Sequence, residues 1–455
     1  MQINRSKRPE SSGIIDFKLP KVHNQKLDNG LNICFVEKSE LPIIRLNLIV
    51  NSGSRYDSEN LNGLNNLLAM CIDEGAGELN SLQLADEFEM LGAQFSVSAD
   101  SDMIHLSLQV LKENFTSALN LFADVLTKPH LNENDFKREQ NKILVRLKQF
   151  NVQPDYLADT AFEYIIFGKS SPYSFPTIGI DKTVNKINIE AVRNTYSNNF
   201  FPLNSNLVVV GDFDLNILHS QLNSTLINWV TNSDLKSQVI ETQKSRKQVL
   251  IINKEGSVQT EIRIGHLASK RNMNDYFQKQ IVNLVLGGQF SSRLNLNLRE
   301  KNGYTYGIHS GFNYWKDAAY FSISTSVDTD LTNSALKEIF YEVDKIKDGV
   351  SSDEMAFAKS SMIKRFPSHF ETFRQISGNI ISKIIHNLPY DYYDNYVSSL
   401  NSVTLQEVNS SCLSSIHLEE LVTVLVGDSK KILNQLKGNE FGEIKVVEYE
   451  KIFEA

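Results

Sequence analysis

The chain carries one sequence pattern twice, once in each half. Ser117-Ala118-Leu119 recurs as Ser334-Ala335-Leu336, and Gly211-Asp212 recurs as Gly427-Asp428. The two offsets in numbering differ by a single position. Two unrelated landmarks with nearly the same offset indicate an internal duplication. The two halves are predicted to cover residues 22–230 and 246–455, joined by a polar linker at 231–245.

Each half combines strand-like and helical patterns. Apolar residues alternate with polar ones in the stretches 44–50, 104–110 and 321–327, as in half-buried strands. Helical spacing follows at 115–126, and the matching helix of the second half is expected from residue 331. Such strands favour an α+β fold over a doubly wound parallel sheet. The duplication predicts two homologous lobes that enclose a space.

Composition excludes several classes of protein. The net charge of −8 and the absence of a long basic run argue against nucleic-acid binding. Three distant cysteines, Cys34, Cys71 and Cys412, do not form a disulfide framework. Neither a signal peptide at 1–20 nor a transmembrane helix is expected. We expect a cytoplasmic protein, or a periplasmic one if a signal was removed, and the Asn, Lys and Ile content suggests an AT-rich bacterial genome.

The histidines do not predict a metal site. The two closest in sequence, His369 and His386, are separated by several helical turns, so no helix presents a histidine pair at i, i+3 or i+4. His105 and His309 lie in or near strand-like segments and are interpreted as surface or satisfied histidines. The sequence has no G-x-S-x-G motif, and Gly287-Gly288 is not followed by the G-K-[ST] of a phosphate-binding loop.

Two segments of the second half resemble the signature of the pitrilysin-type (insulinase-like) metallopeptidases. They are Leu286-Gly-Gly-Gln-Phe-Ser-Ser-Arg-Leu294 and Leu298-Arg-Glu-Lys-Asn-Gly-Tyr-Thr-Tyr-Gly307. Further similarities run through the chain in the family's order. They are found at 27–31, 51–55, 62–64, 167–173 and 388–391. The resemblance implies two lobes, each a mostly antiparallel sheet covered by helices, arranged as a clamshell around a peptide-binding cavity.

Active members of that family hold zinc with H-x-x-E-H on a first-lobe helix and a further Glu about 75 residues later. Here the slot reads Asn66-Leu-Leu-Ala69-Met70, and Val145-Arg-Leu147 stands in the distal region. Ala69 cannot activate water, and Met70 is a weak ligand for zinc. No metal is therefore expected in this chain.

The family's second element is intact. Arg299 and Tyr306 match its Arg/Tyr pair, which projects from the second lobe toward the zinc of the first. A guanidinium can donate to peptide carbonyls, and a tyrosine hydroxyl can stabilise an oxyanion. The alternative is a purely structural role, with a surface Arg paired with a carboxylate and a Tyr packed at a sheet edge. The preceding loop either positions substrate or forms a tight turn with a serine helix cap; its residues are Gly287, Gly288, Phe290, Ser291 and Arg293.

A lobe pair with the Arg/Tyr element but no zinc motif resembles one arrangement in this family, a heterodimer of two homologous chains. The resemblance implies that this chain is the zinc-free subunit and that an H-x-x-E-H partner supplies the zinc; self-association stays open. Peptide could add as a strand at the edge 94–98, although this stretch lacks the Asn-Ala-x-Thr of zinc-bearing members. One alternative is an inactive structural or peptide-binding scaffold, like the homologues in mitochondrial cytochrome bc complexes. Another is an autonomous enzyme with a divergent metal site.

Overall fold

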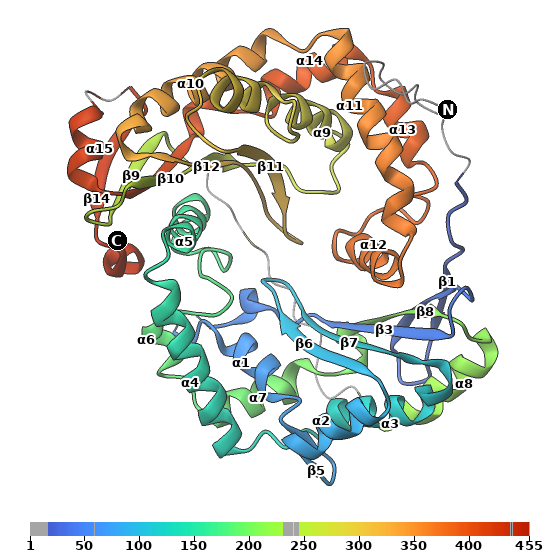
Figure 1. Cartoon of the computed structure of the whole chain (residues 1–455). Coiled ribbons are helices and arrows are strands. Elements are labelled where there is room, and N and C mark those ends of the chain that lie inside the picture. The colour runs from blue at the N-terminus through green and yellow to red at the C-terminus, as the bar shows by residue number, and fades with distance from the viewer. Residues whose placement is uncertain are drawn as a thin grey trace, which may run out of the picture.

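Two lobes, each built on a six-stranded sheet, face each other in the computed structural model (Figure 1). The structure describes residues 17–58, 60–230, 240, 245–436, 438 and 440–454. The predicted linker lies outside the described residues apart from 240 and 245, and the proposed bounds of the two halves stay a prediction. No helix in the described ranges is both long and apolar enough to cross a membrane.

The N-terminal sheet has the strand order β1-β2-β8-β3-β7-β6. All neighbouring strands are antiparallel except β2 and β8. The strands are β1 (His23–Lys26), β2 (Asn32–Glu37), β3 (Ile43–Val50), β6 (Gln94–Ala99), β7 (Ile104–Leu111) and β8 (Ser205–Gly211). A small separate hairpin is formed by β4 (Gly75–Ala76) and β5 (Leu79–Asn80).

The C-terminal sheet has the order β11-β12-β10-β13-β9-β14, with parallel pairing of β9 to β13 and to β14. Its strands are β9 (Gln248–Asn253), β10 (Gln259–Leu267), β11 (Ile308–Tyr314), β12 (Ala319–Asp328), β13 (Val422–Gly427) and β14 (Glu443–Val447). The alternating stretches at 44–50, 104–110 and 321–327 are thus strands β3, β7 and β12, as predicted.

The helical spacing at 115–126 is α3, one of the α-helices of the N-terminal half. These helices are α1 (Leu64–Cys71), α2 (Ser81–Met90), α3 (Phe115–Thr127), α4 (Glu133–Phe150), α5 (Pro154–Phe167), α6 (Asp181–Val184), α7 (Ile189–Asn199) and α8 (Leu215–Leu226). The helices that follow in the chain are α9 (Tyr276–Leu286), α10 (Thr332–Lys345), α11 (Ser352–Arg365), α12 (Phe373–Ile385), α13 (Tyr396–Ser402), α14 (Leu405–Ser414) and α15 (Ser429–Gln435).

The strand register supports the duplication. Gly211 of β8 lies opposite Glu37 of β2, and Gly427 of β13 lies opposite Asn253 of β9. Both members of the second pair follow their counterparts by the same offset in numbering (427 − 211 and 253 − 37). The outermost strands break this symmetry, because β1 pairs antiparallel and β14 pairs parallel.

Each lobe lends one helix to the other lobe's sheet. Helix α5 packs on the inner face of the C-terminal sheet, where Phe162 joins a buried cluster with Val424. Helix α12 packs on the N-terminal sheet, where Ile380 shares a buried cluster with Val208. The outer faces of the sheets cover each lobe's own core. The fold is α+β with two helix-covered lobes arranged as a clamshell, as predicted (Figure 1).

Candidate functional site

The inner faces of both sheets are polar where α5 and α12 leave them free. Residues paired in register share one face of a sheet, so the inner face can be followed from the helix-covered strands to the edges. On the N-terminal sheet it carries Arg45, Ser96, Ser98, His105, Ser107 and Gln109. On the C-terminal sheet it carries Glu261, His309, Asn313, Ser322, Ser324 and Ser326. These side chains are half-buried or exposed, so two polar sheet faces border the space between the lobes.

Strands β6 and β11 form corresponding edges of the two sheets. The segment 94–98, predicted as an edge, belongs to β6, and its inner-face residues Gln94, Ser96 and Ser98 are exposed. An edge strand presents unpaired backbone donors and acceptors that a peptide can join. Strand β11 begins directly after the Arg/Tyr segment. The sequence features associated with peptide binding therefore converge on sheet edges.

The residues of the degenerate zinc slot lie on α1, a helix of the N-terminal lobe. Asn66 and Met70 share one side of the helix, and the Asn66 amide contacts the Met70 sulfur at 3.8 Å. Ala69 is buried in the core of the lobe. Asp57 holds the start of the helix by accepting from the Gly63 and Asn65 amides at 2.7 and 2.9 Å. The helix of the zinc motif is therefore present, but its side chains include none of the His and Glu residues of the H-x-x-E-H motif.

Helix α4 supplies the distal region of the slot. Val145 and Arg146 are exposed, and Leu147 packs into the core. A buried carboxylate that the sequence analysis did not single out, Glu139, lies two helical turns before Arg146. It is neutralised by Lys142 at 2.7 Å and by Arg138 at 3.2 Å. Its regular spacing of two turns from the distal position was the signal that could have identified it.

The residues present do not fit zinc. Catalytic zinc sites use three His, Glu, Asp or Cys ligands and one open position. Asn66, Ala69, Met70 and Arg146 offer none of these side chains, and Glu139 is already committed to two cations. In the described part of the chain, no group of three or more His, Cys, Asp or Glu side chains is arranged to hold a metal ion. We derive no metal-dependent step for this chain.

Arg299 lies in a π-helical segment, η4 (Asn295–Lys301). π-Helical turns are rare and occur often at functional sites. The guanidinium carbon stands 4.1 Å from the ring centre of Phe290, and the nearest carboxylate contact, to Glu300, is a loose one at 3.6 Å. Phe290 itself is 68% exposed. The guanidinium therefore packs against an exposed ring and makes only this loose ionic contact among the described residues.

Tyr306 is 96% exposed, so it does not pack at the sheet edge as the purely structural alternative required. The loop that carries it is nevertheless ordered by hydrogen bonds. The Thr325 hydroxyl of β12 donates to the Gly307 carbonyl and shares a hydrogen bond with the Thr305 hydroxyl, both at 2.9 Å. A tyrosine on such a loop has little backbone conformational entropy to lose on binding, because its backbone is already fixed.

The glycine loop is shaped by close packing. A Cβ on Gly287 would lie 2.5 Å from the Ser310 hydroxyl, and one on Gly288 would lie 2.6 Å from the Asn283 amide. Arg293 is turned toward α11, where it forms a two-point ion pair with Glu354 at 2.8 and 2.9 Å. Ser291 is exposed, and the buried Ser292 accepts from the Asn295 amide at 3.1 Å. Phe290 therefore contacts Arg299, whereas Arg293 is engaged by Glu354 of α11.

Arg55, in one of the family-like stretches, joins the two lobes. It is 1% exposed and bonds to Asp102 at 3.1 Å, to Asp317 of the other lobe at 2.7 Å and to the Tyr173 hydroxyl at 2.8 Å. Lys316 extends the joint through its backbone N–H to Asp102 at 2.8 Å. Arg55 and Tyr173 lie in stretches that resemble the family, but no pattern in the sequence predicted their contacts with Lys316 and Asp317 of the other lobe.

Comparison with known proteins agrees with this arrangement. The model of the insulinase family, peptidase family M16, matches residues 34–168, and that of the peptidase M16 inactive domain matches residues 186–362. The chain belongs to peptidase family M16. The two M16 models match successive parts of the chain, and the second begins within the N-terminal lobe, before α7.

The M16 chain is similar to bacterial relatives over most of its length. It is 26% identical to an uncharacterized zinc protease of Rickettsia felis, with 74% of this chain and 81% of the relative covered. It is 23% identical to the non-peptidase homolog YmxG of Helicobacter pylori, over 88% and 92%. The solved peptidase M16 inactive domain from Pseudomonas fluorescens is 25% identical, with a TM-score of 0.84 over 90% and 98%. Because α1 also lacks the zinc-binding residues, these matches place the chain among inactive M16 homologues.

Proposed function

We propose that this chain is the zinc-free subunit of a two-chain M16 peptidase. It would bind peptide between its polar sheet faces and supply Arg299 and Tyr306 to a shared cavity. The partner would be a homologous chain that carries H-x-x-E-H and zinc. The relative named as a non-peptidase homolog supports the inactive part of this proposal.

The single observation that carries the proposal is the presentation of Tyr306. Its side chain is 96% exposed, while its loop is tied to β12 through Thr305 and Thr325. A chain without a zinc site has no use of its own for such a donor. A partner that holds a developing oxyanion opposite this hydroxyl would gain roughly 2.7–4 kcal/mol of transition-state stabilisation.

Arg299 complements Tyr306 in this role. Its guanidinium carbon lies 4.1 Å from the ring centre of Phe290, and the guanidinium makes only a loose contact to Glu300. Several donors are therefore available for the backbone carbonyls of a bound peptide. Strand addition at β6 or β11 would place those carbonyls along an edge.

The second candidate function is an inactive scaffold. The observation that favours it is the joint between the lobes, in which Arg55 is buried against Asp102 and Asp317. Buried apolar contacts of α5 and α12 reinforce it. A scaffold needs such rigidity, but it does not need an exposed tyrosine on a fastened loop.

Reconstitution separates the two candidates. The purified chain is assayed alone for bound zinc and for hydrolysis of an unfolded peptide, and then with an H-x-x-E-H-bearing M16 chain from the same organism. The proposal expects a complex of the two chains and activity that appears only on mixing and is lost with a chelator. A stable complex without added activity would favour the scaffold, and chelator-resistant hydrolysis by the isolated chain would refute both.

A further inference from the structure

The C-terminal lobe contains an arginine at the position equivalent to Arg55. Arg271 follows β10 as Arg55 follows β3, and their offset in numbering (271 − 55) equals that of the strand register (427 − 211). Both are held by two tyrosines. Arg55 lies over Tyr56 and Tyr173 at 5.2 and 5.4 Å, and Arg271 lies over Tyr276 and Tyr392 at 3.2 and 5.0 Å.

The hydrogen bonds to the tyrosine hydroxyls correspond as well. Arg55 donates to Tyr173 at 2.8 Å, and Arg271 donates to Tyr392 at 2.6 Å. The counter-charges differ. Arg55 has carboxylates on both sides, whereas no carboxylate among the described residues pairs with Arg271. The duplicated unit therefore keeps its arginine in the second lobe but not the acids that neutralise it.

The tyrosines cannot replace those acids. Burial raises the pKa of Tyr276 and raises the pKa of Tyr392 to about 12, so both phenols are neutral at pH 7. The nearby Asp275 pairs with Lys279 at 3.1 Å. The guanidinium has five N–H donors, and one is used by Tyr392. A half-buried positive charge with free donors calls for an anion from elsewhere.

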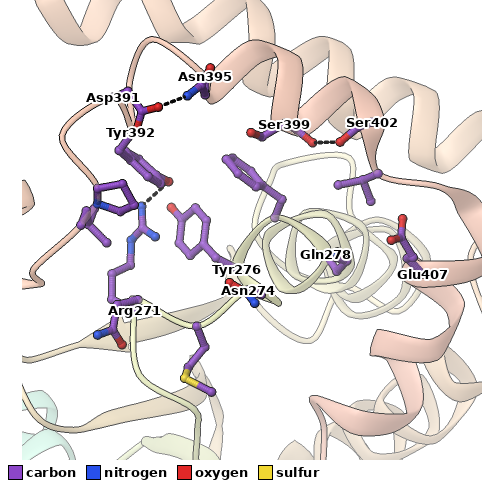
Figure 2. A pocket seen from close by; sticks show the side chains of 16 residues that line it. Arg271, Asn274, Tyr276, Gln278, Asp391, Tyr392, Asn395, Ser399, Ser402 and Glu407 are labelled. Atoms are coloured by element: carbon purple, nitrogen blue, oxygen red, sulfur yellow. Dashed lines mark hydrogen bonds between the residues drawn. The ribbon is translucent and has the colours of Figure 1, made fainter.

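Arg271 opens onto a cavity of about 370 Å³ (Figure 2). Such a volume lies at the lower end of small-molecule sites. Apolar walls come from Met273, Phe277, Leu388, Pro389 and Val403. Amide side chains that can bond a peptide backbone come from Asn274, Gln278 and Asn395. The cavity thus offers one cation, apolar contacts and neutral polar groups.

The acidic residues of the cavity narrow the choice of ligand. Asp391 and Glu407 also line it, and Glu407 lies across the pocket from Arg271 (Figure 2). Two carboxylates would repel a phosphate or a polyanion. They tolerate a ligand that has a single carboxylate at one end and a neutral or positive group at the other. The free C-terminus of a short peptide has this chemistry, and an arginine fork binds a carboxylate at two points.

We propose that the cavity beside Arg271 binds the C-terminal carboxylate of a short peptide with an apolar last residue. The carboxylate would take the place at Arg271 that Asp102 and Asp317 take at Arg55. This site is separate from the Arg/Tyr element, so its existence does not depend on an M16 partner.

Calorimetry on the intact chain tests the site with the dipeptide Gly-Leu and its C-terminal amide. Gly-Leu is expected to bind with a dissociation constant below about 1 mM, and the amide at least roughly tenfold more weakly. Because this comparison needs no variant, it does not depend on folding of a mutant. Equal binding of acid and amide, or absence of binding by both, would overturn the proposal.

Two further measurements test whether Arg271 binds the ligand and whether the ligand group is a peptide carboxylate. Arg271→Gln should weaken Gly-Leu binding by roughly tenfold or more, whereas Arg246→Gln, the same change at an exposed site, should leave it unchanged. Inorganic phosphate and N-acetyl-aspartate amide serve as other anions. Binding of either as tightly as Gly-Leu would contradict recognition of a peptide C-terminus.

Discussion

Arg55 of the N-terminal lobe and Asp317 of the C-terminal lobe form an ion pair of 2.7 Å, in which the arginine is 1% exposed. Asp317 lies in the turn between β11 and β12, and β11 begins directly after the Tyr306 loop. This ion pair therefore fixes one lobe against the other close to β11, the strand that follows the segment with Arg299 and Tyr306. Buried charges of this kind are weak sources of stability as a pair but costly to break singly.

Replacing Arg55 by Met should lower the free energy of unfolding by about 3–5 kcal/mol, because Asp102 would be left buried without its cation. Urea denaturation measures the change. The control is Lys137→Met, which removes an exposed pair with Glu133 and should cost no more than about 1 kcal/mol. Similar costs for the two variants would show that the joint contributes nothing special.

Burial raises the pKa of Glu163 to about 7, with Tyr320 donating to its carboxyl at 3.1 Å across the lobes. The folded state then holds a proton that the unfolded state has lost, so stability should fall as pH rises from about 4.5 to about 7. Glu163→Gln should flatten this part of the pH profile of urea unfolding. An unchanged slope in the variant would assign the pH dependence to other groups.

Gly287→Ala should destabilise the chain by about 1–3 kcal/mol, because its Cβ would press against Ser310 of β11 at 2.5 Å. Ser310→Gly removes the closest contact but also the buried hydrogen bond from Ser310 to Asn283, so it is measured alone as well. Gly287→Ala should then cost less in the Ser310→Gly background than in the wild type. Gly307→Ala is the matched control, since its Cβ meets open space. Thermal unfolding compares the variants, and an equal cost of Gly287→Ala in both backgrounds would place the strain elsewhere.

Much of the fold could be predicted because the duplication leaves local marks. The Gly-Asp pairs end equivalent strands, and the alternation around Leu46 and Ile323 corresponds to β3 and β12. The exchange of α5 and α12 could not be predicted. Apolar residues such as Phe162 reveal that a helix is buried, but they do not reveal which sheet covers it.

The candidate site was predictable to a similar extent. The family resemblance placed Asn66, Ala69 and Met70 on a first-lobe helix, which is α1, whereas the position of Arg299 and Tyr306 directly before the edge strand β11 was not predicted. Spacing could not show that Arg293 pairs with Glu354, because these residues belong to different elements far apart in the chain. Nor could it show the contact between Arg55 and Asp317, which lie in different halves. Side-chain partners distant in sequence leave no periodic signal.

Adding the missing donors to α1 should not restore a zinc site by itself. The variant Asn66→His, Ala69→Glu, Met70→His provides two histidine ligands, whereas a catalytic zinc needs three protein ligands. Metal analysis after dialysis should find little zinc, and more after Arg146→Glu is added. Stoichiometric zinc in the triple variant would show that another side chain already serves as the third ligand.

The most direct measurement is kcat/KM of the complex with an H-x-x-E-H chain, comparing Tyr306→Phe with Tyr341→Phe. Tyr341 is also exposed but lies on α10, so it matches the chemical change without the proposed role. Loss of one oxyanion donor predicts a decrease of about 10²–10³-fold for Tyr306→Phe, with assembly unchanged and Tyr341→Phe near wild type. A decrease under about threefold would contradict a donor role for this subunit.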